Sequence, residues 1–196
     1  MAITTVNQAT AELYRRVRDV NETAHASVML PVLSDCQRLI NAAYGGVLTD
    51  VTLTRTSAQT LYPYSDLASD VIRCVSVVYS GRVLQRLNWR ELANIDPQWL
   101  RAIGSTPRVW DMIGHNLLLI YPSPTIASTK AVTVRYVPEL ADLTAGENLA
   151  IPAAYVTPML DLAEEVLLWR HRTFMSIEGA AAAVERHSDV RLVGAS

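Results

Sequence analysis

The sequence predicts an α+β protein in which N- and C-terminal helices form a small helical bundle, with a central antiparallel β insertion between them. Near both ends, apolar residues recur every three or four positions, the spacing of one face of a helix. Between residues 47 and 137, short segments alternate apolar and polar residues, the period of a half-buried strand. The 196 residues show no internal repeat, linker or low-complexity stretch, so a single domain, 1–196, is expected.

Two helices are predicted within residues 5–45. The first covers residues 5–20, and its apolar stripe consists of Ala9, Leu13, Val17 and Val20. The second begins near Pro31, because proline fits the first turn of a helix, where its missing N–H is not needed. Gly45 and Gly46 are expected to end this helix, since glycine readily adopts the left-handed conformation of helix ends.

The β insertion, residues 47–137, is predicted to begin with the alternating segment 51–54. Segment 71–79 is rich in β-branched and aromatic residues, which favour strands. Ser80 and Gly81 then supply a turn, from which segment 82–87 is expected to return as a hairpin partner.

The remainder of the insertion is predicted to contain one short helix and three more strands. Asn88 is a suitable cap for the helix, and Pro97 should end it. Segments 108–112 and 116–121 flank a short glycine-containing turn, and segment 131–136 alternates again. The insertion should therefore contain about six strands.

Helices are expected again over residues 152–186. Thr157 and Pro158 favour a helix start, and the apolar stripe that follows consists of Met159, Leu162, Val166 and Trp169. This stripe is wide enough to suggest burial between other helices. The segment 187–196 ends in small and polar residues, so a flexible C-terminal tail is expected.

Composition excludes several classes of protein. Half of the residues are hydrophobic and 18% are charged, which is typical of a folded protein. The net charge is −2 and no block of Lys and Arg stands out, so a strong grip on nucleic acid is not expected. The longest strongly apolar run, 117–121, is far shorter than the roughly 20 residues that span a membrane. Cys36 and Cys74 lie in apolar segments and are expected to be buried thiols in a reducing compartment.

The sequence predicts no cofactor, no metal and no catalytic site. The glycine-rich spacings that bind phosphates are absent, and the histidines are scattered at His25, His115, His171 and His187. Glu164 and Glu165 are candidates for acid–base chemistry, but adjacent carboxylates on a helix more often form a solvated face. His171, between two arginines, is a candidate for anion contact or for simple complementation of a helix dipole, and the second interpretation is favoured.

Aromatic residues leave two interpretations open. The four tryptophans are expected to pack either in a core or at an interface with another subunit. They are Trp89, Trp99, Trp110 and Trp169. Tyr62-Pro63-Tyr64 is typical either of an extended edge that meets a neighbouring subunit or of a strand entering the core.

The order of these segments resembles that of the head-to-tail adaptor proteins of tailed bacteriophages, also called head completion or connector proteins. The likeness covers most of the chain. In the first half it rests on Leu39-Ile40-Asn41, 59–64, Asp70-Val71-Ile72-Arg73, 75–81 and Leu84. In the second half it rests on Trp99, Gly104-Ser105-Thr106-Pro107, 117–121, Pro122-Ser123-Pro124, Tyr136 and Ile151-Pro152.

The resemblance implies a structural virion protein and not an enzyme. It implies an adaptor-like domain that forms a homo-oligomeric, dodecameric ring between the portal protein and tail or nozzle proteins. DNA would pass through the lumen of the ring without specific binding, and no membrane is involved. The protein would be made in the host cytoplasm and would reside in the neck of the virion, between capsid and tail.

The resemblance also implies that the C-terminal segment reaches toward the portal. The candidate portal-interface residues are Arg186, His187, Arg191 and Leu192. Other readings of the chain are another phage neck or tail completion protein, a small enzyme with a noncontiguous active site, and a nucleic-acid-binding module. A pocket with converging titratable groups would favour the enzyme, and salt-sensitive affinity for DNA would favour the nucleic-acid binder.

Overall fold

The computed structural model describes residues 3–18, 25–53, 59–104, 106–124 and 131–169. These residues divide into two compact units. The first unit contains the described residues up to Val47 and from Glu139 onward, and the second contains those of Leu48–Pro138. The described chain is of mixed α+β type with four α-helices and mostly antiparallel strands, in agreement with the predicted class.

Local capping residues account for the start of the first helix and the end of the second in the first unit. The helices of this unit are α1 (Val6–Arg16), α2 (Met29–Tyr44), the short 3-10 helix η3 (Ala153–Tyr155) and α4 (Val156–Trp169). Thr5 and Gln8 form a capping box at the start of α1, each side chain accepting a hydrogen bond from the backbone N–H of the other. Gly45, with φ of 65°, ends α2 as predicted. Helix α1 ends at Arg16, earlier than predicted, because the chain leaves the helical region at Arg18, where φ is 59°.

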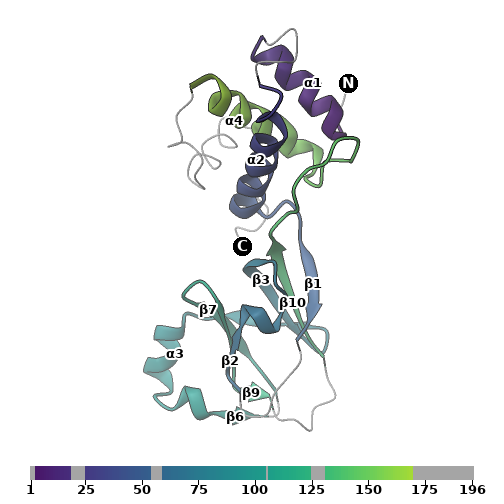
Figure 1. Ribbon diagram of the computed structural model, residues 1–196. Helices are drawn as coiled ribbons and strands as arrows, with labels where there is room; N and C mark the ends of the chain where they lie inside the picture. Colours follow the sequence, from purple (N-terminus) through teal and green to yellow (C-terminus); the bar gives the residue numbers. More distant parts are fainter. Residues whose placement is uncertain (1–2, 19–24, 54–58, 105, 125–130, 170–196) are drawn as a thin grey trace. The chain divides into compact units, whose positions relative to one another are not determined.

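Helices α1, α2 and α4 lie side by side (Figure 1), and their apolar side chains belong to one core. Leu13, Leu33 and Met159, one from each helix, are fully buried. Burial of a side chain of this size is worth roughly 1.5–3 kcal/mol. Helix α4 contacts both α1 and α2, so its wide apolar surface is covered from two sides.

The loop that precedes η3, residues 139–150, has no regular secondary structure, yet it is fixed to the helices by hydrogen bonds. The N–H of Val6 donates to Glu147 O at 2.9 Å, and the N–H of Leu149 donates to Thr4 O at 3.0 Å. The N–H of Leu143 donates to the buried hydroxyl of Ser34 in α2 at 3.0 Å. These bonds replace the partners that a strand or helix would have given the loop backbone.

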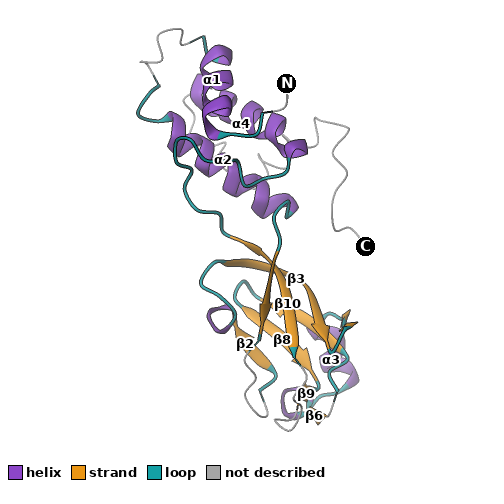
Figure 2. Ribbon diagram, turned by 90° about the vertical axis from the view of Figure 1, so that its right-hand side faces the viewer, coloured by secondary structure: helices purple, strands orange, loops and turns teal. Residues whose placement is uncertain are grey.

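The strands of the second unit form two four-stranded sheets and one short ladder (Figure 2). The first sheet has the order β1 (Thr49–Thr52), β10 (Val132–Pro138), β3 (Val71–Tyr79) and β4 (Arg82–Val83). The second has the order β2 (Leu61–Pro63), β8 (Leu117–Tyr121), β7 (Val109–Ile113) and β5 (Gln85–Arg86). The ladder joins β6 (Ile103–Gly104) to β9 (Ser123–Pro124). Three short helices lie between strands: η1 (Tyr64–Asp66), α3 (Trp89–Ile95) and η2 (Trp99–Arg101).

The predicted return strand, 82–87, is in fact two strands that belong to different sheets. Strand β4 pairs with β3, whereas β5 pairs in parallel with β7. The chain crosses over at the buried Leu84, whose N–H still donates to Val77 O at 2.8 Å. The next amide, that of Gln85, donates to Arg108 O in the other sheet at 3.2 Å. Burial of one apolar side chain between the sheets thus accompanies the change of pairing partner.

The predicted number of strands was too low, and the insertion is not wholly antiparallel. Strands β6 and β9 were not predicted, because segments of two residues are too short to display an alternating period, whereas β2 overlaps Tyr62-Pro63-Tyr64, for which an extended conformation was expected. Among the described residues, the β5–β7 and β6–β9 pairs are parallel, and the other pairs of strands are antiparallel.

Strand β8 of the second sheet contributes side chains to two cores, one on each of its faces. Its Leu118 and Ile120 belong to the core shared by the two four-stranded sheets. The residue between them, Leu119, belongs to a smaller core with Leu92 of α3 and Trp99 of η2. A continuous apolar run is the pattern of a strand buried on both faces, and this strand is covered on both.

Candidate interaction surfaces

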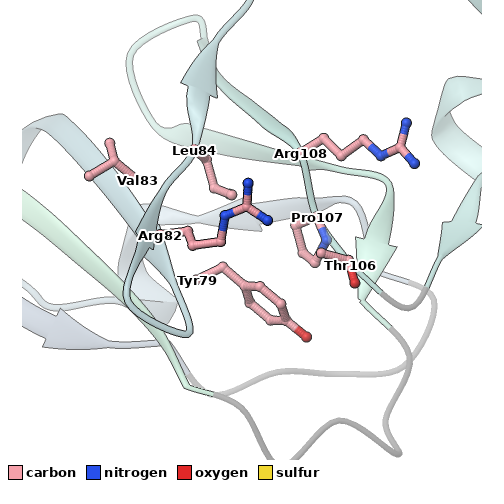
Figure 3. Close-up of a pocket in the computed structure, with 7 residues that line it drawn as sticks. All are labelled: Tyr79, Arg82, Val83, Leu84, Thr106, Pro107 and Arg108. Carbon is pink, nitrogen blue, oxygen red and sulfur yellow. The ribbon is translucent and has the colours of Figure 1, made fainter.

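One hollow in the second unit is lined by cationic, hydroxyl and apolar side chains. Figure 3 shows the Arg82 guanidinium near Leu84 and Tyr79, whereas the Arg108 side chain extends away from Arg82. Its volume is about 420 Å³. The lining residues come from the end of β3, from β4 and the residue after it, and from the segment before β7, and are Tyr79, Arg82, Val83, Leu84, Thr106, Pro107 and Arg108. A hollow of this size accommodates one or two side chains of a partner or a small anion.

The two arginines of this hollow are held on rigid backbone. Arg82 follows a tight turn in which Ser80 and Gly81 both have positive φ, 51° and 79°. Arg108 is fixed from two sides, since its N–H donates to Tyr121 O at 2.8 Å and its carbonyl accepts from Gln85 N. Both side chains are exposed. No acidic side chain in the described part of the protein forms an ion pair with either guanidinium.

A second, smaller hollow of about 290 Å³ adjoins the first. The two share Thr106 and Arg108, and Tyr121 also lines the second one. The Tyr121 hydroxyl donates a hydrogen bond to Asp96 Oδ2 at 2.8 Å, and this bond to a carboxylate raises the pKa of the tyrosine. Tyr121 therefore stays neutral at physiological pH, and the guanidinium of Arg108 is the charged group of this hollow.

The groups around the two hollows suit binding better than catalysis. Their described lining includes guanidinium and hydroxyl groups but no carboxylate, imidazole or thiol. General acid–base or nucleophilic chemistry near neutral pH usually draws on one of these three groups. Within the described ranges, His, Cys, Asp and Glu side chains also form no cluster of three suited to a metal ion.

The two cysteines lie in the cores, as the sequence predicted. Cys36 is buried in the helical unit and Cys74 in the β unit. Burial raises the pKa of the Cys74 thiol to about 11 and raises that of Cys36 as well. Both side chains are therefore protonated thiols at neutral pH and are poor nucleophiles.

Glu164, one of the two adjacent carboxylates of α4, belongs to an ionic network between two helices. Arg16 of α1 contacts Asp161 at 2.5 Å and Glu164 at 3.6 Å, and also binds Glu12 at 3.0 Å. Hydrogen bonds from Arg15 and then Arg16 lower the pKa of Glu12 to about 2. Glu164 thus joins α4 to α1, which supports a structural role for this carboxylate.

The aromatic residues whose side chains are described mostly fill cores. Trp99 and Trp110 are buried, and Trp89 is half-buried under the guanidinium of Arg90, 5.5 Å from its ring centre. Tyr62 and Tyr64 are buried, so their side chains face the core, and β2 is at the same time an edge strand of its sheet. The side chain of Trp169 lies outside the described part of the chain.

The candidate portal-interface residues Arg186, His187, Arg191 and Leu192 lie outside the described residues, as does His171. Sequence reasoning did not single out Arg82 or Arg108, which are 26 positions apart. They share a hollow only because the chain crosses from one sheet to the other between them.

Most of the chain matches a known protein family. Residues 2–189 match the family model described as SU10 adaptor protein. No curated protein matches the chain. None of the described helices has the length and apolar character needed to cross a membrane.

Proposed function

The chain belongs to the SU10 adaptor protein family, and from this premise we propose that it is a structural virion protein that joins the portal of a tailed phage to its tail. As a head-to-tail adaptor it forms a ring and continues the DNA channel. The single observation that carries this proposal is the extent of the family match. Residues 2–189 include the whole of the β unit and most of both stretches of the helical unit, so the likeness covers nearly the whole chain.

The two units are proposed to work as one adaptor-like domain, in which a helical bundle carries the β insertion. Two observations support this. Helices α1 and α2 share a core with α4, although the whole of Leu48–Pro138 separates them in sequence. The loop 139–150, which returns from the β unit, is fixed to α1 and α2 by backbone and side-chain hydrogen bonds.

The proposed partners are the portal protein on one side and tail or nozzle proteins on the other, in the neck of the virion. The subunits are proposed to form a dodecameric ring. DNA crosses the lumen without specific binding, and the net charge of −2 supports this, since a strongly basic wall would retain the passing DNA.

The C-terminal segment is proposed to contact the portal through Arg186, His187, Arg191 and Leu192. Deletion of residues 186–196 should then weaken binding to the portal while the described helices and strands keep their circular dichroism spectrum. Portal binding that is unchanged after the deletion would remove the basis for this assignment.

We assign no reaction to the chain. Glu164 is engaged with Arg16, and the two thiols are buried and protonated. The described lining of the two hollows offers guanidinium and hydroxyl groups, which bind anions but do not form a nucleophile–base pair.

The mass of the purified protein in solution, alone and mixed with the portal ring encoded in the same genome, tests the proposal. A ring-sized complex in either setting is the expected result. A chain that stays monomeric alone and ignores the portal would contradict the adaptor role. Light scattering coupled to size exclusion gives the mass without reference to shape.

A further inference from the structure

The hollow beside Arg82 and Arg108 has the character of a docking site for an acidic protein segment. Two exposed guanidinium groups without an ion-pair partner in the described chain attract an anion, and guanidinium groups bind carboxylates through paired hydrogen bonds. The same hollow is lined by Val83, Leu84 and Pro107. Val83 is 71% exposed beside Arg82. Arginine next to accessible apolar surface is typical of protein interfaces. A phosphodiester backbone, in contrast, offers phosphate oxygens but no apolar side chain to pack against valine.

Formal charge indicates where such a segment is found. Residues 48–138 hold nine of the 17 Lys and Arg but only six of the 19 Asp and Glu. The rest of the chain holds eight Lys and Arg against 13 Asp and Glu. The β unit is therefore positive, with a formal charge of +3, and the remaining sequence is negative, with −5. Surfaces of opposite sign on one chain favour contacts between unlike faces of two copies.

The loop 139–150 supplies acidic groups in a suitable form. It contains Glu139, Asp142 and Glu147 and no Lys or Arg. Asp142 is bound to Arg38 at 2.6 Å, whereas the exposed Glu139 and Glu147 form no ion pair within the described chain. The backbone at Glu147 is fixed, because its carbonyl accepts from Val6 N, so little conformational freedom is lost when its side chain binds.

We propose that the hollow lined by Arg82 and Arg108 receives the acidic loop 139–150 of a neighbouring copy of the chain, with Glu147 and Glu139 as the bound carboxylates. This inference rests on the ring proposed above. A ring closes through contacts between two different surfaces of each subunit, and the basic hollow and the acidic loop are two such surfaces. Because both are held on rigid backbone, each copy presents them ready to bind.

Charge exchange tests the pairing. The double variant R82E/R108E and the double variant E139R/E147R should each weaken assembly by about tenfold or more at low ionic strength, because attraction becomes repulsion. The quadruple variant, which carries both changes, should assemble again. In 1 M salt, where the screening length is about 3 Å, the two double variants should assemble with a strength closer to that of the wild type. A matched control is R90E/R101E, which reverses two exposed arginines of the same unit that do not line the hollow.

The readout is the mass of the assembly formed by the full chain, alone at high concentration or on the portal ring, with circular dichroism to confirm folding. Assembly of R82E/R108E at wild-type strength would overturn the inference. Loss of assembly that the quadruple variant does not restore would also overturn it, since the hollow would then serve a different partner. If the wild type itself fails to assemble in both settings, the proposed ring fails first, and that result is distinct from the other two.

Discussion

Replacement of Ser34 by alanine should detach the loop 139–150 from helix α2. Ser34 is 2% exposed, and its hydroxyl donates to Leu30 O at 2.8 Å and accepts from Leu143 N at 3.0 Å. Without it, the Leu143 amide is a buried donor with no partner, which costs about 1–3 kcal/mol. Alanine favours a helix more than serine does by about 0.5 kcal/mol, which offsets part of this loss. The free energy of unfolding should therefore fall by about 1–2 kcal/mol.

Hydrogen exchange of the full chain is the assay that localises this effect. The Leu143 amide should exchange about 5- to 30-fold faster in S34A, since a loss of about 1–2 kcal/mol of local stability changes the opening equilibrium by that factor. The variant S27A is the control, because Ser27 is exposed in the same unit and its loss should change stability by less than about 0.5 kcal/mol. If S34A exchanges at Leu143 as slowly as the wild type, the hydroxyl does not hold the loop, and the reasoning is wrong.

Two further predictions concern buried or paired carboxylates. The pKa of Glu12 is lowered from 4.5 to about 2 by its two arginine partners, so its stabilising contribution is complete above about pH 4.5 and is lost as pH falls toward 2. The variant E12Q should accordingly lose less stability than the wild type between pH 5 and pH 2 in thermal unfolding. Asp111, 5% exposed, accepts from Trp89 N at 2.9 Å and from Arg86 Nε at 3.2 Å. D111A should lower stability by about 1–3 kcal/mol in urea unfolding followed by tryptophan fluorescence, and a change below about 0.3 kcal/mol would show that water replaces these bonds.

Features that depend on neighbouring residues in the chain could be predicted from the sequence. Strand β3 covers Val71–Tyr79 as expected, because its composition and the Ser80-Gly81 turn are local signals. The end of α2 at Gly45 is local for the same reason. Both cysteines were correctly expected in apolar surroundings, since the apolar pattern around each one is visible in the sequence.

Features that depend on distant partners could not be predicted. The chain changes sheets at Leu84 because the Gln85 N–H donates to Arg108 O in the other sheet. The sequence near either residue contains no signal that predicts this pairing. The hollow lined by Arg82 and Arg108 follows from this crossover, so its residues show no motif in sequence. The loop 139–150 lacks any period, because its backbone is satisfied by side chains and by helix ends more than 100 positions away.

The first unit is built from two stretches of chain separated by Leu48–Pro138, and this order has a consequence during synthesis on the ribosome. The β unit is continuous, so it can complete its sheets as soon as it has emerged. Helices α1 and α2 emerge earlier but must wait for α4, since Arg16 and Asp161, which join α1 to α4, are 145 positions apart. The faces of α1 and α2 that pack on α4 therefore stay uncovered until α4 has been synthesised. Chaperones that bind exposed apolar surfaces should accordingly have more time to bind α1 and α2 than any later helix.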